Sequence, residues 1–198
     1  MYNNKLKLGW FIGVIVILAS CAQSPQKVEL APRFEVPDAP RANGQPVHVR
    51  VSDQRAKKVL GSRGGAYPET AVITLANDLS SAVTPAVKEH LQALGYNVDS
   101  LDANTVDLHI IFDSLVYHHP EDDGVGHDMD MEAEVRVEAS RNNQSYNGRY
   151  RVKRQQKFFN APSDTQNSEL INALVVEVLE NMLADQKLQE FLNGASPV

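Results

Sequence analysis

Residues 128–159 read DMDMEAEVRVEASRNNQSYNGRYRVKRQQKFF, and this stretch decides the fold. From Met129 to Ala139, apolar residues alternate with charged residues. Strict alternation of this kind is typical of an antiparallel strand with one solvated face. Asn142 and Asn143 tolerate a positive φ and supply a turn. The segment 145–159 returns with its arginines and lysines on the face opposite its tyrosines, so the stretch predicts a long β-hairpin.

The charges of this hairpin favour one register, although the sequence alone does not settle it. A two-residue turn at Asn142 and Asn143 places acidic residues opposite basic ones: Glu134 opposite Arg151, Glu132 opposite Lys153 and Asp128 opposite Lys157. Each such pair contributes roughly 0.2–1 kcal/mol. Arg136 opposite Arg149 is the one mismatch, which a longer loop would remove by shifting the register. We therefore interpret the acidic and basic runs as a solvated set of cross-strand pairs rather than as binding patches.

Three further segments have strand patterns. The segment 105–117 alternates well enough to pair with the hairpin as a third strand of a meander. Near the start of the domain, 47–52 alternates valine with polar residues, and 71–76 is a short apolar run. The segment 53–69 between these two contains three glycines and a proline, which indicates a loop.

Two helices are predicted, one on each side of the meander. Apolar residues at helical spacing predict a helix over 164–183, and Asp185 caps a last turn after it. The other helix has two possible starts. Either Asp78 caps it and Pro85 kinks it from inside, or Thr84 is the N-cap and Pro85 occupies the first turn. The element order predicts an α+β fold, with an antiparallel sheet of about four to five strands and two helices packed on one face.

The first twenty residues predict a secretory leader. Lys5 and Lys7 precede the apolar run LGWFIGVIVILA at 8–19, which is too short to span a bilayer as a helix. The run ends in LASC at 18–21, which resembles the lipobox of bacterial lipoproteins. The resemblance implies cleavage before Cys21, a diacylglycerol thioether on Cys21 and an acyl chain on its new amine. No other cofactor is expected.

Composition supports a lipid anchor. Cys21 is the only cysteine, so no intramolecular disulfide is possible. Two or three acyl chains on one residue anchor firmly, whereas one chain holds only marginally. By resemblance to enterobacterial sorting, Ala22 in place of an aspartate implies the outer membrane, with the domain facing the periplasm. The chain then divides into a signal peptide at 1–20, a lipidated proline-rich tether at 21–45, one domain at 46–193 and a disordered tail at 194–198.

The tether and the charge narrow the possible partners. The segment 22–45 contains four prolines and no periodic apolar face, so about 24 residues of extended chain could reach on the order of 70 Å. Without the leader and its two lysines, the chain contains 17 basic and 25 acidic residues, and its net charge changes from −6 to −8. This balance argues against nucleic acid as a partner and against an electrostatic grip on anionic lipid.

The order of these segments resembles one family. The lipobox, VRVSDQR, AVITLANDL, HLQALGYNV, VDLHIIFDSLVY, the charged hairpin and the closing LQEFL together are similar to the YajG family of outer-membrane lipoproteins. The resemblance covers nearly the whole mature chain and implies a periplasm-facing domain of this topology. The family has no established biochemical activity, so no catalytic residue is implied. The architecture is also similar to small accessory lipoproteins of outer-membrane assembly.

The connection between the strands at 105–117 and 128–139 is rich in histidine and carboxylate. It reads VYHHPEDDGVGHD at 116–128, and its metal-ligand candidates are His118, His119, His127 and Asp128. A specific site needs three or four converging ligands, and adjacent histidines point to opposite sides of an extended chain. The acidic run lacks the ligand spacing of a calcium loop. We interpret the segment as a hairpin loop, and a metal site is the less favoured hypothesis.

No catalytic motif stands out. A nucleophile elbow, HExxH, P-loop and dinucleotide fingerprint are all missing from the sequence. GSRGG at 61–65, near Lys57 and Lys58, could cradle an anion but does not enter a helix, so a plain loop is the better interpretation.

Two function classes remain. The first is a non-catalytic, membrane-tethered binding or scaffold module with an envelope protein partner. The second is a ligand-binding module with an apolar pocket between helices and sheet for a lipid or glycan fragment.

Overall fold

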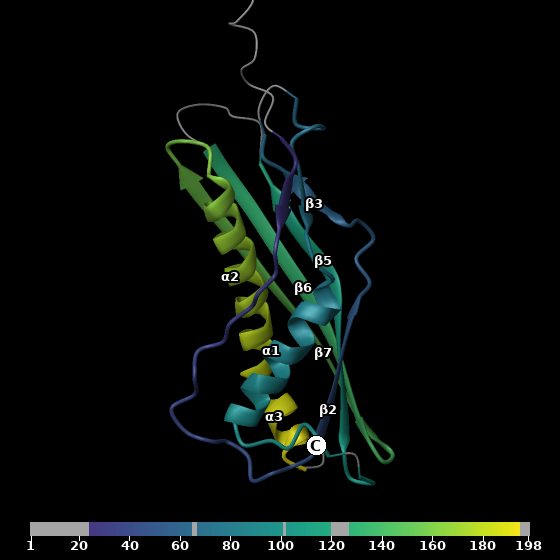
Figure 1. Ribbon diagram of the computed structural model, residues 1–198. Helices are drawn as coiled ribbons and strands as arrows, with labels where there is room; N and C mark the ends of the chain where they lie inside the picture. Colours follow the sequence, from purple (N-terminus) through teal and green to yellow (C-terminus); the bar gives the residue numbers. More distant parts are fainter. Residues whose placement is uncertain (1–23, 65–66, 101, 120–126, 195–198) are drawn as a thin grey trace, which may run out of the picture.

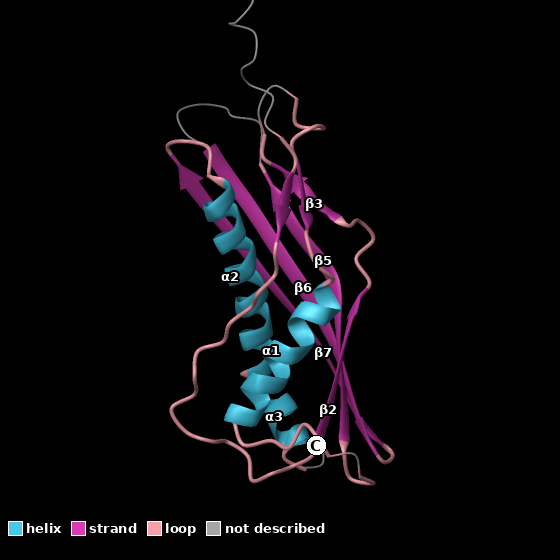
Figure 2. Cartoon of the chain, viewed as in Figure 1, coloured by secondary structure: helices cyan, strands magenta, loops and turns pink. Residues whose placement is uncertain are grey.

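A seven-stranded sheet forms the centre of the computed structural model, which describes residues 24–64, 67–100, 102–119 and 127–194 (Figures 1 and 2). Its strands are β1 (Gln26–Val28), β2 (Val47–Asp53), β3 (Val59–Ser62), β4 (Val72–Leu75), β5 (Val106–His118), β6 (His127–Arg141) and β7 (Gln144–Phe158). They lie in the order β1-β4-β3-β5-β6-β7, and β2 also pairs with β5. The three longest strands form the predicted meander.

The α+β class is confirmed, but the sheet is mixed rather than purely antiparallel and has more strands than predicted. β2 runs parallel to β5 from Val106 to Phe112, and β3 runs parallel to it at Tyr117. A helix between β4 and β5 returns the chain in the direction of β2, which is the geometry of a parallel crossover. β1 and β3 were missed because strands of three and four residues are too short to show alternation.

The register of the hairpin is confirmed. Arg141 pairs with Gln144, and Asn142 between them has a φ of 52°. The predicted cross-strand partners are all present: Glu134 with Arg151, Glu132 with Lys153 and Asp128 with Lys157. The mismatch of Arg136 with Arg149 is real as well, so no longer loop removes it. It is relieved because the Arg136 side chain turns to Asp113, 3.3 Å away, and Arg149 turns to Glu134, 2.6 Å away.

Three helices pack on one face of the sheet, one more than predicted (Figure 2). They are α1 (Leu79–Ala93), α2 (Asp164–Leu183) and α3 (Gln186–Leu192). α3 is the expected last turn extended to seven residues, and the Asp185 side chain caps it by accepting from the Leu188 amide at 3.0 Å. The apolar stripe predicted for α2 is buried. The layer between helices and sheet is therefore the hydrophobic core.

The start of α1 is settled in favour of Asp78. Its carboxylate accepts a hydrogen bond from the Ser81 amide at 2.7 Å, which is the contact of an N-cap. Pro85 lies inside the helix, and the alternative start at Thr84 is wrong. The Thr84 hydroxyl instead donates to the Ser80 carbonyl at 2.7 Å.

The segment predicted to be a free tether is attached to the domain. β1 pairs with β4 in parallel, and Val28 and Leu30 are 0% and 2% exposed. The Asn77 side chain accepts from the Leu30 amide at 2.9 Å and donates to its carbonyl at 2.8 Å. Farther along, the Ala42 amide donates to the Leu94 carbonyl at 3.0 Å. Prolines dominate the composition of this segment, but the apolar residues between its charged ones supply enough burial to hold it.

The domain is elongated along its longest strands (Figure 1). β7 has 15 residues, and a strand of that length spans about 50 Å at 3.3 Å per residue. In Figure 1 the upper end of the domain gathers the end of β5, the β3–β4 connection, the end of β7 and the start of α2. Arg63 links two of these elements, because its guanidinium lies 2.5 Å from the Asp164 carboxylate. The Asn142–Asn143 turn lies at the lower end.

Candidate functional site

The face of β5, β6 and β7 opposite the helices is called the open face here. Throughout the described chain, the helices cover only the other face (Figure 2). The side chains of the open face alternate along each strand with buried ones, as the two-residue period requires. They include His109, Val116 and His118 on β5, even-numbered residues from Asp128 to Glu138 on β6, and odd-numbered residues from Arg149 to Lys157 on β7.

The middle of the open face is a network of ion pairs around Glu134. This carboxylate is 4% exposed, although it belongs to the solvated face. Arg149 donates to it at 2.6 Å, and the Nε of Arg151 donates at 2.7 Å. Both guanidiniums are themselves more than half exposed, with 63% and 51% of their side chains accessible. The arginines therefore cover the carboxylate while keeping their own outer surface available for a partner.

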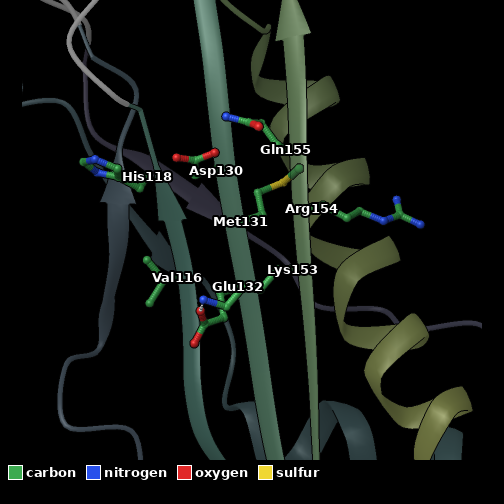
Figure 3. Close-up of a pocket in the computed structure, with 8 residues that line it drawn as sticks. All are labelled: Val116, His118, Asp130, Met131, Glu132, Lys153, Arg154 and Gln155. Atoms are coloured by element: carbon green, nitrogen blue, oxygen red, sulfur yellow. Dashed lines mark ion pairs between the residues drawn. The ribbon is translucent and has the colours of Figure 1, made fainter.

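A groove of about 600 Å³ lies on the open face toward the upper end (Figure 3). Val116 and His118 of β5, Asp130 and Glu132 of β6, and Lys153 and Gln155 of β7 line it. Lys153 and Glu132 form an ion pair at 3.0 Å across it. In Figure 3, Arg154 points away from the groove toward α2, where it meets Glu177 at 2.6 Å. Carboxylates, a cation, an amide and one apolar side chain together suit recognition of a polar, partly apolar surface.

The metal-ligand candidates form no group in the described part of the chain, which does not include the side chain of His127. His118 ends β5 on the open face, opposite Asp130. His119 follows it and lies over Gly64, where an added Cβ would come within 3.1 Å of the imidazole ring. His127 begins β6 opposite Phe158, and Asp128 lies 3.8 Å from Lys157. The described residues contain no group of three or more potential ligands, and residues 120–126 of the loop lie outside them.

Two of the cations near the glycine-rich stretch at 61–65 have partners of their own. Lys58 pairs with Asp53 at 2.8 Å, and Arg63 pairs with Asp164. Gly61 lies directly against β5, since a Cβ built on it would be 1.5 Å from the Tyr117 carbonyl oxygen. The first glycine of the stretch therefore permits strand pairing.

A buried ion pair stands where β2 ends. The Arg55 side chain is 3% exposed and donates two hydrogen bonds of 2.8 Å to the Asp53 carboxylate. Burial would by itself raise the pKa of Asp53, but the hydrogen bonds from Arg55 and Lys58 outweigh it and lower the pKa to about 2. The pair is thus ionised at neutral pH and fixes the chain as it leaves β2 for β3. This pair was not predicted from the sequence, because both residues lie in a segment interpreted as a loop.

A buried chain of hydrogen bonds joins β5, α2 and β1 and was also missed. The Tyr117 hydroxyl donates to the Asn167 side-chain oxygen, and the Asn167 amide donates to the Gln26 side-chain oxygen at 2.9 Å. The Gln26 amide donates in turn to the Asp164 carbonyl at 2.7 Å. All three linked side chains are at most 4% exposed, and burial raises the pKa of Tyr117. The only sequence signal was an asparagine in the apolar stripe of a helix.

The layer between the helices and the sheet is filled with side chains. Leu108, Ile110 and Phe112 of β5 belong to the same buried cluster as Leu174 and Val178 of α2, and each is at most 1% exposed. The groove of Figure 3 lies on the opposite face of the sheet. A ligand-binding role would therefore use the open face rather than the expected pocket under the helices.

Comparison with known proteins identifies the family. A family model described as uncharacterised lipoproteins matches residues 32–193. The chain belongs to this family. It is 23% identical over 184 residues to the uncharacterised lipoprotein YajG of Escherichia coli K12, an alignment that covers 90% of this chain and 92% of that protein. YajG of Escherichia coli O6:H1 matches equally well. The resemblance to the YajG family is thereby confirmed.

Solved structures of similar shape add no functional information. A crystal structure of an uncharacterised protein matches with a TM-score of 0.47 and 11% identity, covering 79% of this chain and 96% of that one. Protein XCC0632 of Xanthomonas campestris has the same TM-score and identity, covering 82% and 92%.

Membership in a lipoprotein family associates the chain with a membrane. Within the described ranges, no helix is both long and apolar enough to cross a bilayer.

Proposed function

We propose that this protein is anchored in the outer membrane by acyl chains on Cys21, faces the periplasm, and acts as a non-catalytic protein-binding or scaffold module of the cell envelope. The open face carries the proposal. It is a surface of three long strands on which Glu132 and Glu134 are paired with Arg149, Arg151 and Lys153, and these three basic side chains are more than half exposed. Such a surface needs little reorganisation to meet a partner, and so costs little entropy on binding.

The size of the open face fits a protein partner. Three strands about 4.8 Å apart and about 50 Å long present roughly 700 Å². A standard interface buries about 800 Å² on each side. Val116, 41% exposed at the groove, supplies an apolar contact within this polar surface.

The proposed anchor rests on the sequence at the end of the leader. LASC at 18–21 provides the lipobox, and Ala22 supports outer-membrane sorting. Intact-mass measurement of the membrane-extracted protein should give a chain that starts at Cys21 and carries two or three acyl chains. An unmodified thiol with residues 1–20 still attached would overturn the anchor.

In-cell photo-crosslinking tests the partner. A photoreactive amino acid placed at Val116 or Lys153, on the open face, should capture a discrete envelope protein. Glu89 on α1 and Glu169 on α2 are exposed on the helical side and serve as matched controls. Equal capture from both faces, or none from the open face, would refute the role of this surface.

A further inference from the structure

We infer that the upper end of the domain rests on the bilayer surface, with Phe159 and Tyr67 placed among the lipid headgroups. The partner of this surface is the membrane in which the chain is anchored. The inference deepens the proposed function, since it requires the lipid on Cys21.

The length of chain after Cys21 limits how far the domain can stand from the membrane. Only the four residues 22–25 separate Cys21 from Gln26, the first residue of β1. Fully extended, the five steps from residue 21 to residue 26 reach at most about 18 Å. The tether expected from the prolines would have reached about 70 Å. Whatever course these residues take, covalent geometry keeps the start of β1 near the lipid.

β1 is fastened at this point and does not extend the reach by peeling away. Gln26 is 4% exposed and bonds through its side chain to Asn167 and to the Asp164 carbonyl. Two residues later, Val28 is 0% exposed. Ser24, nearer the anchor, receives a hydrogen bond from Arg63 at 3.4 Å. The anchored chain thus joins the domain at the end where α2 begins.

Two of the most exposed aromatic side chains lie at this same end. Phe159 follows the last residue of β7 and is 91% exposed. Tyr67 lies in the connection between β3 and β4 and is 59% exposed. Both connections are at the upper end in Figure 1. One exposed apolar residue needs no explanation, but two aromatic residues beside the anchoring point lie where a bilayer surface would cover them.

Two of the charged side chains at this end are paired with each other. Arg63 and Asp164, the charged side chains that tie the upper end together, neutralise each other. The acyl chains supply the affinity for the membrane, so no basic patch is required. The aromatic side chains then need only orient the domain, by favouring the arrangement in which the upper end contacts the lipid. The 15-residue strands then project away from the membrane and carry the Asn142–Asn143 turn to the far end.

The composition of the chain offers a direct test. Trp10 is the only tryptophan and lies in the leader, so the mature protein has none. Phe159→Trp and Tyr67→Trp each introduce one fluorophore at the upper end, and Asn143→Trp introduces one at the far end. The lipidated full-length mature proteins are reconstituted into phosphatidylethanolamine–phosphatidylglycerol vesicles, with and without phosphatidylcholine brominated on its acyl chains. Bromine quenches only a tryptophan that lies near the chains.

Tryptophan at positions 159 and 67 should lose most of its emission in the brominated vesicles and shift to shorter wavelength. Tryptophan at position 143 should be unaffected. If the emission at 159 and 67 is as insensitive to bromine as at 143, the upper end does not touch the bilayer and the inference is wrong. Quenching at all three positions also overturns it, because the domain then lies flat. Intact mass of the same samples confirms the lipid, so failure of the anchor is distinguished from failure of the orientation.

Discussion

The buried hydrogen bonds through Tyr117, Asn167 and Gln26 allow a test in which a second substitution repairs the first. Asn167→Ala removes the acceptor of the Tyr117 hydroxyl and the donor to the Gln26 side-chain oxygen. Tyr117 is 1% and Gln26 4% exposed, so both atoms lose their partner out of reach of solvent. Each unpaired buried group costs about 1–3 kcal/mol, so this substitution should lower the free energy of unfolding by about 2–6 kcal/mol.

Tyr117→Phe should have opposite effects in the two backgrounds. In the wild-type protein it leaves the Asn167 side-chain oxygen unpaired and costs about 1–3 kcal/mol. Added to Asn167→Ala, it removes the stranded hydroxyl and leaves only the Gln26 oxygen without a partner. The double variant should therefore be more stable than Asn167→Ala by about 1–3 kcal/mol, a coupling within the range seen for residues in contact.

Equilibrium urea unfolding followed by far-ultraviolet circular dichroism measures these differences, on protein that begins at residue 22. The slope with denaturant must stay the same for the four proteins to be compared. Tyr67→Phe is the matched control, because Tyr67 is 59% exposed, and its effect should stay within about 0.5 kcal/mol. Additive losses in the double variant would refute the reasoning, since they would mean that Tyr117 and Asn167 stabilise the protein independently.

Three further substitutions probe the sheet. Gly61→Ala should cost about 3 kcal/mol by urea unfolding, because its Cβ would meet the Tyr117 carbonyl at 1.5 Å; unchanged stability would disprove the close pairing. Glu134→Gln should cost about 1–2 kcal/mol and reduce the salt dependence of unfolding, since a 4% exposed carboxylate loses two arginine partners. The pKa of Asp53 in the folded protein is low, about 2. Ionised Asp53 therefore stabilises the fold at pH values above its unfolded-state pKa, and this stability is lost as the pH falls through 2. Asp53→Asn should destabilise the protein at neutral pH, because it leaves the buried Arg55 guanidinium without a charged partner. The same substitution should flatten the pH dependence of the free energy of unfolding between about pH 5 and 2.

The two strands of the hairpin and the turn between them were predictable because two independent signals agreed there. The apolar alternation fixed which side chains face the core. The opposite charges favoured one set of facing residues, although the mismatch of Arg136 with Arg149 left a longer loop as an alternative. A shift by one position would have buried a row of carboxylates, which makes the register strongly specified. Asn142, with its φ of 52°, supplied the turn that both signals required.

The parallel strands could not be predicted in the same way. The pairing of β2 with β5 joins residues about 60 positions apart, such as Val47 with Val106, and nothing local records it. β3 pairs with β5 at one position, where Gly61 permits close approach, and a glycine in a loop-like segment gives no hint of a strand. β1 was hidden for a different reason. Its attachment depends on Gln26, a polar residue whose partners lie more than 130 positions later in α2.

The attachment of β1 also constrains what the open face can meet. A freely tethered domain would explore the space above the membrane in every orientation. With Cys21 lipidated as proposed and the chain fastened at Gln26, the reach of about 18 Å and the domain length of about 50 Å would confine the open face to within about 70 Å of the lipid. Confinement raises the effective concentration of a partner that lies in the same layer and does nothing for one that diffuses freely beyond it. The proposed partner is therefore a protein held at the same membrane, and it meets the groove of Val116 and His118 on the part of the open face closest to the lipid.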